Sequence, residues 1–177
     1  MPESNIQSHH KPDPRYRIEV IDHASDNSLE SRISAAVQSV LQGFAVPRAE
    51  ISVALVDDPT IHRLNRDFLQ HDWPTDVVTF PGQDPMNVGG PNVNDDSDAV
   101  FGEIIISLDT ARRVADEMSL GYEGEVVLYA VHGSLHLIGL DDHTESERAE
   151  MRGAESKYME LAGFPGYARQ SDQVSGP

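Results

Sequence analysis

The sequence predicts a mixed β-sheet packed with helices, in the α/β or α+β class. Short segments in which apolar and polar side chains alternate are interleaved with longer segments whose apolar residues recur every three or four positions. Four segments have the first pattern, typical of strands, and five have the second, typical of helices. The 177 residues are the length of one domain with a single hydrophobic core.

The first half of this pattern is strand, helix, strand, helix. "YRIEVID" (16–22) and "AEISVALVDD" (49–58) have strand patterns, and residues 28–44 between them have helical spacing. The apolar stripe of that helix is Leu29, Ile33, Ala36, Val37, Val40 and Leu41. The next helix starts at Asp58, which we expect to cap it because Pro59 suits the first helical position.

The second half completes the sheet and adds three helices. "TDVVTFP" (75–81) and "GEIIIS" (102–107) are predicted strands, separated by a loop rich in Gly, Pro, Asn and Asp at 82–99. The predicted helices cover 108–118, 121–139 and a segment that ends near Gly163. The last one begins at Thr144, because "TESE" forms a capping box with Glu147.

The ends of the chain are polar, so we expect disordered tails at 1–15 and 169–177 around a single domain at 16–168. The net charge of −17 argues against binding nucleic acid or membranes through bulk electrostatics, so any RNA contact must be local. The sequence has no cysteine, no signal-peptide pattern and no membrane-spanning apolar run. We therefore expect a cytoplasmic protein whose metal ligands, if any, are His, Asp or Glu.

The stretch "HGSLHLIGLDDH" (132–143) predicts a metal site. His132 and His136 are four residues apart, which places both imidazoles on one helical face. Gly139 suits the left-handed turn that ends a helix, after which the chain can bring back a third ligand, either Asp142 or His143. Three protein ligands would leave one position of a zinc ion open for water. We expect one zinc ion per chain and a metallo-hydrolase domain.

Gly133 distinguishes this motif from that of the zinc peptidases. Those enzymes carry H-E-x-x-H, in which the Glu is the general base, and here glycine stands at the Glu position. A peptidase mechanism would lack its proton acceptor.

The same stretch resembles the motif of the YbeY family of metal-dependent bacterial endoribonucleases, H-G-x-L-H-L-x-G-[YF]-D-H. "LNRDFLQHDWPTDVVTFP" (64–81) and "GEIIIS" are also similar to that family's motifs, and the resemblance spans about residues 16–163 in consistent order. It implies an α+β fold with a mixed four-stranded sheet and about five helices, and a zinc ion held by three histidines.

Two departures from the family pattern affect the site. The last histidine comes one residue late, so that Asp142 stands at the family's ligand position; we expect His143 to be the third ligand because a loop can absorb one residue, with Asp142 as the alternative. Leu69 stands where the family usually has an arginine. Arg63 and Arg66, three residues apart on one helix, are therefore the candidate RNA-binding residues.

The resulting hypothesis is a zinc-dependent, single-strand-specific endoribonuclease that acts in rRNA maturation at the 16S 3′ end and in ribosome quality control. Its partners would be rRNA and the ribosome or its small subunit, and no membrane. The catalytic base and the oligomeric state are not predicted. The alternatives are a ribosome-associated assembly factor with structural zinc, which the acidic charge and Leu69 favour, and a metallo-hydrolase of another substrate.

Overall fold

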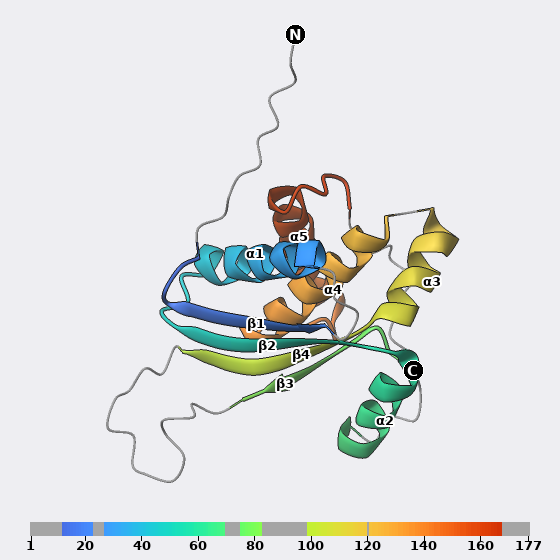
Figure 1. Ribbon diagram of the computed structural model, residues 1–177. Helices are drawn as coiled ribbons and strands as arrows, with labels where there is room; N and C mark the ends of the chain where they lie inside the picture. The colour runs from blue at the N-terminus through green and yellow to red at the C-terminus, as the bar shows by residue number, and fades with distance from the viewer. Residues whose placement is uncertain (1–11, 23–26, 70–74, 83–98, 120, 168–177) are drawn as a thin grey trace.

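The computed structural model describes residues 12–22, 27–69, 75–82, 99–119 and 121–167 (Figure 1). The strands are β1 (Tyr16–Asp22), β2 (Ala49–Val56), β3 (Val77–Pro81) and β4 (Val100–Ser107). The helices are α1 (Asn27–Gly43), α2 (Asp58–Leu69), α3 (Leu108–Met118), α4 (Tyr122–Leu137) and α5 (Glu145–Leu161). None of these helices is both long enough and apolar enough to cross a bilayer.

Two predicted irregular regions lie largely outside the described residues. Residues 1–11 and 169–177 of the predicted tails are not described, and neither are residues 83–98 of the predicted loop or Ala168 at the end of the predicted domain. Within the predicted N-terminal tail, Asp13 is described, and its backbone N–H donates to Gln38 Oε1 of α1 at 3.2 Å.

The described strands form one mixed sheet in the order β1-β2-β4-β3. The pairs β1–β2 and β2–β4 are parallel, whereas β3 runs antiparallel to β4 at the edge. β4 begins at Val100, earlier than the predicted residue 102, because Val100 pairs with Ala49 of β2. Four strands with five helices confirm the predicted α+β class.

The helices cover the two faces of the sheet unequally. Figure 1 shows α1, α4 and α5 on one face and α2 on the other. Because successive side chains of a strand point to opposite faces, Ile104 and Ile106 of β4 enter the main core while Ile105 packs in a smaller core beside Ile61 of α2. The α1 stripe predicted from the sequence lies in the main core and is fully buried.

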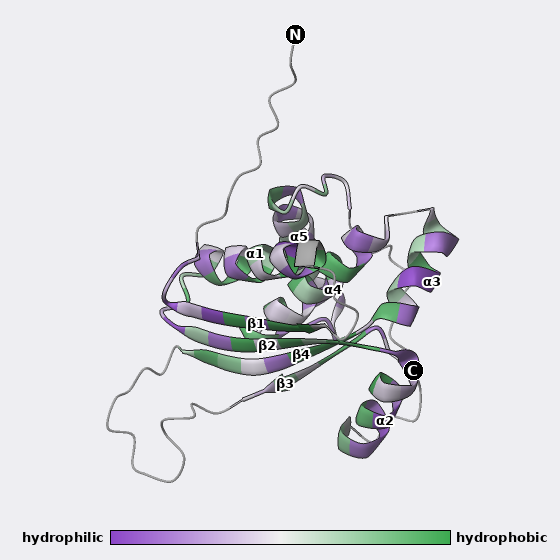
Figure 2. Ribbon diagram, viewed as in Figure 1, coloured by the Kyte–Doolittle hydropathy of each residue, from purple (hydrophilic) through white to green (hydrophobic). Residues whose placement is uncertain are grey.

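α4 is the central helix of the main core. It packs against β3, β4, α1, α3 and α5, and its residues from Gly124 to Leu135 are all buried. Figure 2 shows a hydrophobic stretch on α4 beside paler and hydrophilic segments, whereas α3 has both hydrophobic and hydrophilic residues. A polar side chain on α4 therefore faces protein, and burying it without a hydrogen-bond partner would cost stability. His132, only 5% exposed, is such a side chain.

The helix starts were predicted with mixed success. The capping box is confirmed: Thr144 N–H donates to Glu147 Oε2 at 2.7 Å, and Glu147 N–H donates to Thr144 Oγ1 at 3.3 Å. Asp58 as the cap of α2 was wrong. Asp57 has that role, because its Oδ1 accepts from Thr60 N–H at 2.9 Å, while the carboxylate of Asp58 binds side chains of β4 and α3.

Candidate metal centre

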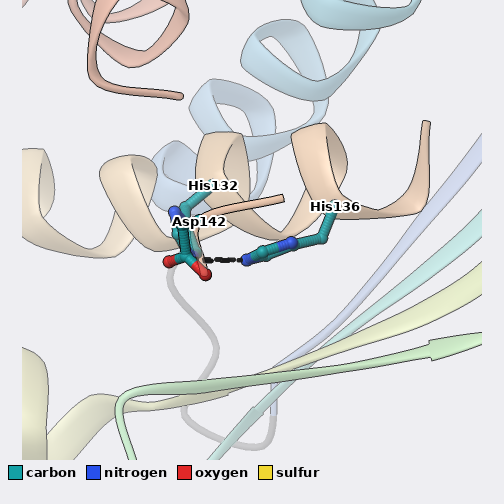
Figure 3. A group of neighbouring side chains, drawn as sticks. All are labelled: His132, His136 and Asp142. Carbon is teal, nitrogen blue, oxygen red and sulfur yellow. Dashed lines mark hydrogen bonds and ion pairs between the residues drawn. The ribbon is translucent and has the colours of Figure 1, made fainter. Parts of the chain in front are cut away.

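Two histidines on the last turns of α4 face each other (Figure 3). The Nε2 atoms of His132 and His136 are 3.0 Å apart, and the two rings are nearly perpendicular, with an interplanar angle of 89°. His132 is buried, and His136 lies closer to the surface, with 25% of its side chain exposed. The i, i+4 spacing on one helical face, predicted from the sequence, produces this convergence.

The outer nitrogen of each ring is held by an oxygen atom. His132 Nδ1 lies 2.7 Å from Glu155 Oε1 of α5, and His136 Nδ1 lies 3.0 Å from the backbone oxygen of Leu140. The Leu140 carbonyl oxygen can only accept a hydrogen bond, so Nδ1 of His136 carries the hydrogen, and the carboxylate oxygen of Glu155 offers an acceptor for a hydrogen on Nδ1 of His132. In neutral imidazoles, both Nε2 lone pairs then point into the same space.

A tight turn at the end of α4 brings the third group. Gly139 has φ +100°, its N–H donates to the His136 carbonyl at 2.9 Å, and the Leu140 N–H donates to the Leu135 carbonyl at 3.0 Å. These two bonds define a Schellman motif, which confirms the turn predicted at Gly139. The reversed chain places Asp142 Oδ2 3.9 Å from His132 Nε2 and 4.0 Å from His136 Nε2.

This donor set fits a divalent metal ion. Two ligands bound to zinc at about 2.0 Å with a tetrahedral angle lie about 3.3 Å apart, so the three separations need only small adjustments. Burial and the neighbouring His132 both lower the pKa of the His136 imidazole, although Asp142 and the Leu140 carbonyl partly oppose this effect, and the neutral form is the one that binds metal. Two inward lone pairs beside a carboxylate need a cation between them, either a proton or a metal.

The structure brings Asp142, and not His143, to the histidine pair. The side chain of His143 is 83% exposed, and its Nε2 lies 3.2 Å from Asp141 Oδ1. Arg148 fixes the turn by donating to the carbonyl oxygens of Asp142 and His143, at 3.2 and 2.8 Å. His132, His136 and Asp142 therefore form one candidate metal group, and His143, our first expectation, lies outside it, in a second and more exposed group with Asp141 and Asp142.

Comparison with known proteins identifies the family of this chain. The model of the family described as Endoribonuclease YbeY matches residues 17–163. The chain belongs to this family. An Endoribonuclease YbeY of Rhodopirellula baltica is 40% identical over 84% of this chain and 73% of the relative, and one of Desulfitobacterium hafniense is 40% identical over 77% and 84%. A solution structure of a Thermotoga maritima protein, 26% identical, covers 83% of this chain and 88% of its own with a TM-score of 0.56.

The glycine of the YbeY motif has a packing reason in this chain. A Cβ atom at Gly133 would lie 2.7 Å from Ile104 Cγ2 and 3.1 Å from Thr79 Cγ2. Because α4 rests this closely on β3 and β4, the position that holds a glutamate in zinc peptidases has no room here for a side chain. The absence of a peptidase base, inferred from the sequence, thus has a structural basis.

Sequence reasoning did not identify Glu155 as part of the site. Glu155 is 1% exposed, and its carboxylate contacts His132 of α4, which is 23 residues earlier in the sequence. A signal was present: Glu155 shares the buried stripe of α5 with Met151, Tyr158 and Met159, where a charged residue needs a partner.

The two predicted RNA-binding arginines lie on α2, which packs on the face of the sheet opposite α4 (Figure 1). Both are exposed; Arg66 Nε donates to Asp67 Oδ1 at 3.0 Å and Arg63 Nη2 to Thr60 Oγ1 at 3.4 Å. α2 ends at Leu69, the residue at the family's usual arginine position.

Proposed function

We propose that this chain is a zinc-dependent endoribonuclease that cleaves single-stranded RNA, with the ion held by His132, His136 and Asp142. Membership of the Endoribonuclease YbeY family supports the reaction. The observation that carries the site is the pair of Nε2 atoms 3.0 Å apart, each ring held from behind by an acceptor, with a carboxylate beside them.

The chain's own residues have distinct tasks in this proposal. His132 and His136 supply neutral nitrogen donors, and Asp142 supplies an anionic oxygen that balances part of the metal charge. When bound, zinc supplies Lewis acidity toward a phosphoryl oxygen and lowers the pKa of a bound water to about 7. The exposed fractions of His136 and Asp142, 25% and 36%, leave one side of the group open to a substrate.

We assign the biological substrate to ribosomal RNA, including the 3′ end of 16S RNA, and the role to rRNA maturation and ribosome quality control in the cytoplasm. Contact with RNA then has to be local, because the chain carries a net charge of −17. Arg63 and Arg66 are the proposed contacts. The exposed pair of Arg66 with Asp67 is of a kind worth at most about 1 kcal/mol, so a phosphate can compete for the arginine.

Salt dependence tests the arginines. Replacing both Arg63 and Arg66 with Ala should weaken binding of a single-stranded RNA and flatten its dependence on salt concentration, with zinc content unchanged. Arg152→Ala on α5 is a control for a general loss of positive charge. An unchanged salt slope in the double variant would remove the two arginines from the RNA site.

A nuclease assay tests the function. Purified full-length protein should cut single-stranded RNA internally, lose this activity with a chelator and regain it when zinc is added back. His132→Ala should be inactive under all three conditions, which excludes a contaminating nuclease. A protein that binds zinc stoichiometrically but leaves RNA intact would contradict the proposal and favour the assembly factor with structural zinc.

A further inference from the structure

Glu155 is a buried carboxylate on α5 that ends against one of the two metal-site histidines. It is 1% exposed, and its Oε1 lies 2.7 Å from Nδ1 of His132. A carboxylate is almost never fully buried unless it is paired, because losing water costs far more for an ion than for a neutral group. The distance is typical of a charge-assisted hydrogen bond.

The two histidines are oriented by different means. His136 is held by the carbonyl of Leu140, which belongs to the same turn and follows from local helix-ending geometry. His132 is held by a side chain from another helix, so its orientation depends on the packing of α5 against α4. Glu155 has apolar neighbours in its own helix stripe, Met151, Tyr158 and Met159, and fills a position where an apolar residue would serve the core alone.

We propose that Glu155 is the positioning residue of the metal centre: its carboxylate accepts the Nδ1 hydrogen of His132, and this leaves the Nε2 lone pair directed at the ion. A rotated ring, or a ring with its hydrogen on Nε2, would no longer direct a lone pair at the ion. The carboxylate also makes the imidazole a stronger donor. This inference rests on the proposed metal site, which it deepens.

Zinc affinity is the first test. Zinc should be titrated into full-length metal-free protein in competition with a chromophoric chelator. Glu155→Gln keeps the size of the side chain but removes its charge, and its amide can donate to Nδ1 as well as accept from it. The expected loss is about 10- to 100-fold in zinc affinity. Glu160→Gln, an exposed glutamate of the same helix, is the matched control and should bind as wild type does.

The protonation pattern of His132 is the second test, and a purely structural role would not produce it. In ¹⁵N-histidine NMR spectra of the zinc-loaded wild-type protein, Nδ1 of His132 should carry the hydrogen and Nε2 should be the bound nitrogen. Zinc on Nδ1, or a hydrogen-free Nδ1, would overturn the proposal even if the Gln variant failed to fold.

The outcomes separate the two proposals. Wild-type protein that binds no zinc refutes the metal site, and the role of Glu155 falls with it. Wild-type protein that binds zinc, with equal affinity in a folded Glu155→Gln variant, refutes the role of Glu155 and leaves the metal site intact.

Discussion

Two aspartates near helix ends, Asp58 and Asp142, have similar exposure but opposite surroundings. The side chain of Asp58 is 26% exposed, and that of Asp142 is 36% exposed. Asp58 faces hydrogen-bond donors: the hydroxyls of Ser107 and Thr110, the latter at 2.8 Å, and Nη1 of Arg113 at 3.2 Å. Asp142 faces the two Nε2 atoms of the histidine pair, at 3.9 and 4.0 Å.

This difference separates a structural carboxylate from a candidate ligand. The donors around Asp58 satisfy its charge within the protein and tie the start of α2 to β4 and α3. Asp142 and its neighbours all present lone pairs to one space, an arrangement that is favourable only with a cation inside it. A buried or half-buried carboxylate is therefore best classified by the donors or acceptors that face it.

Of the substitutions that test this contrast, removing either histidine should have the largest effect on zinc binding. His132→Ala or His136→Ala should abolish stoichiometric zinc binding, because each removes one of two facing nitrogen donors. Elemental analysis of tag-free protein after zinc reconstitution measures this. His62→Ala on α2 is the control and should keep its zinc. Full zinc content in either site variant would place the ion elsewhere.

Replacing Asp142 should have the next largest effect on zinc affinity. Comparison with a substitution at His143 decides between the two candidate third ligands. Asp142→Ala should lower zinc affinity by more than about 100-fold, because it removes a ligand atom and not merely a partner that orients one. His143→Ala should cost less than about 10-fold, since that imidazole is exposed and pairs with Asp141. Chelator competition gives both values, and a reversed order would restore His143 as the ligand.

Asp58→Asn should have the smallest effect on metal and a clear effect on stability. The loss of the charge-assisted hydrogen bonds should reduce the free energy of unfolding by roughly 1–3 kcal/mol at neutral pH, with zinc affinity unchanged. Urea denaturation measures the cost, and Asp116→Asn, an exposed residue of α3, is the control. A large change in zinc affinity would break the distinction between the two aspartates.

The pH dependence of the Asp58 effect has a defined sign. Burial opposes ionisation of Asp58, but the hydrogen bonds from Ser107 and Thr110 and the contact with Arg113 outweigh it and lower the pKa of the carboxyl. A lowered folded-state pKa adds stability above the unfolded-state pKa, and that stability is lost as pH falls through the folded-state pKa. The difference between wild type and Asp58→Asn should therefore shrink in acid, and a difference that grows in acid would contradict this assignment.

Much of the fold could be predicted because its signals are local. The α1 stripe, the capping box at Thr144 and the turn at Gly139 each depend on residues within a few positions of one another. The order of the strands could not be predicted, because β2 pairs with β4 although residues 57–99, which carry α2 and β3, lie between them in the sequence.

The site was predicted only in part, for the same reason. The His132–His136 pair follows from spacing within one helix, whereas the partner of His132 comes from α5 through tertiary packing. The choice between Asp142 and His143 depends on side-chain directions in a turn fixed by Arg148, and spacing along the chain does not encode those directions. Asp58 was assigned to a cap because its true partners, on β4 and α3, are remote in sequence.

The central claim is that His132, His136 and Asp142 together hold one metal ion, and a crystal structure of the zinc-loaded protein with anomalous data at the zinc edge tests it most directly. The predicted result is one anomalous peak per chain, within about 2.0–2.2 Å of Nε2 of His132, Nε2 of His136 and a carboxylate oxygen of Asp142, with His143 still turned to solvent. A peak bound to His143 in place of Asp142, or no peak between the two histidines, would contradict the account.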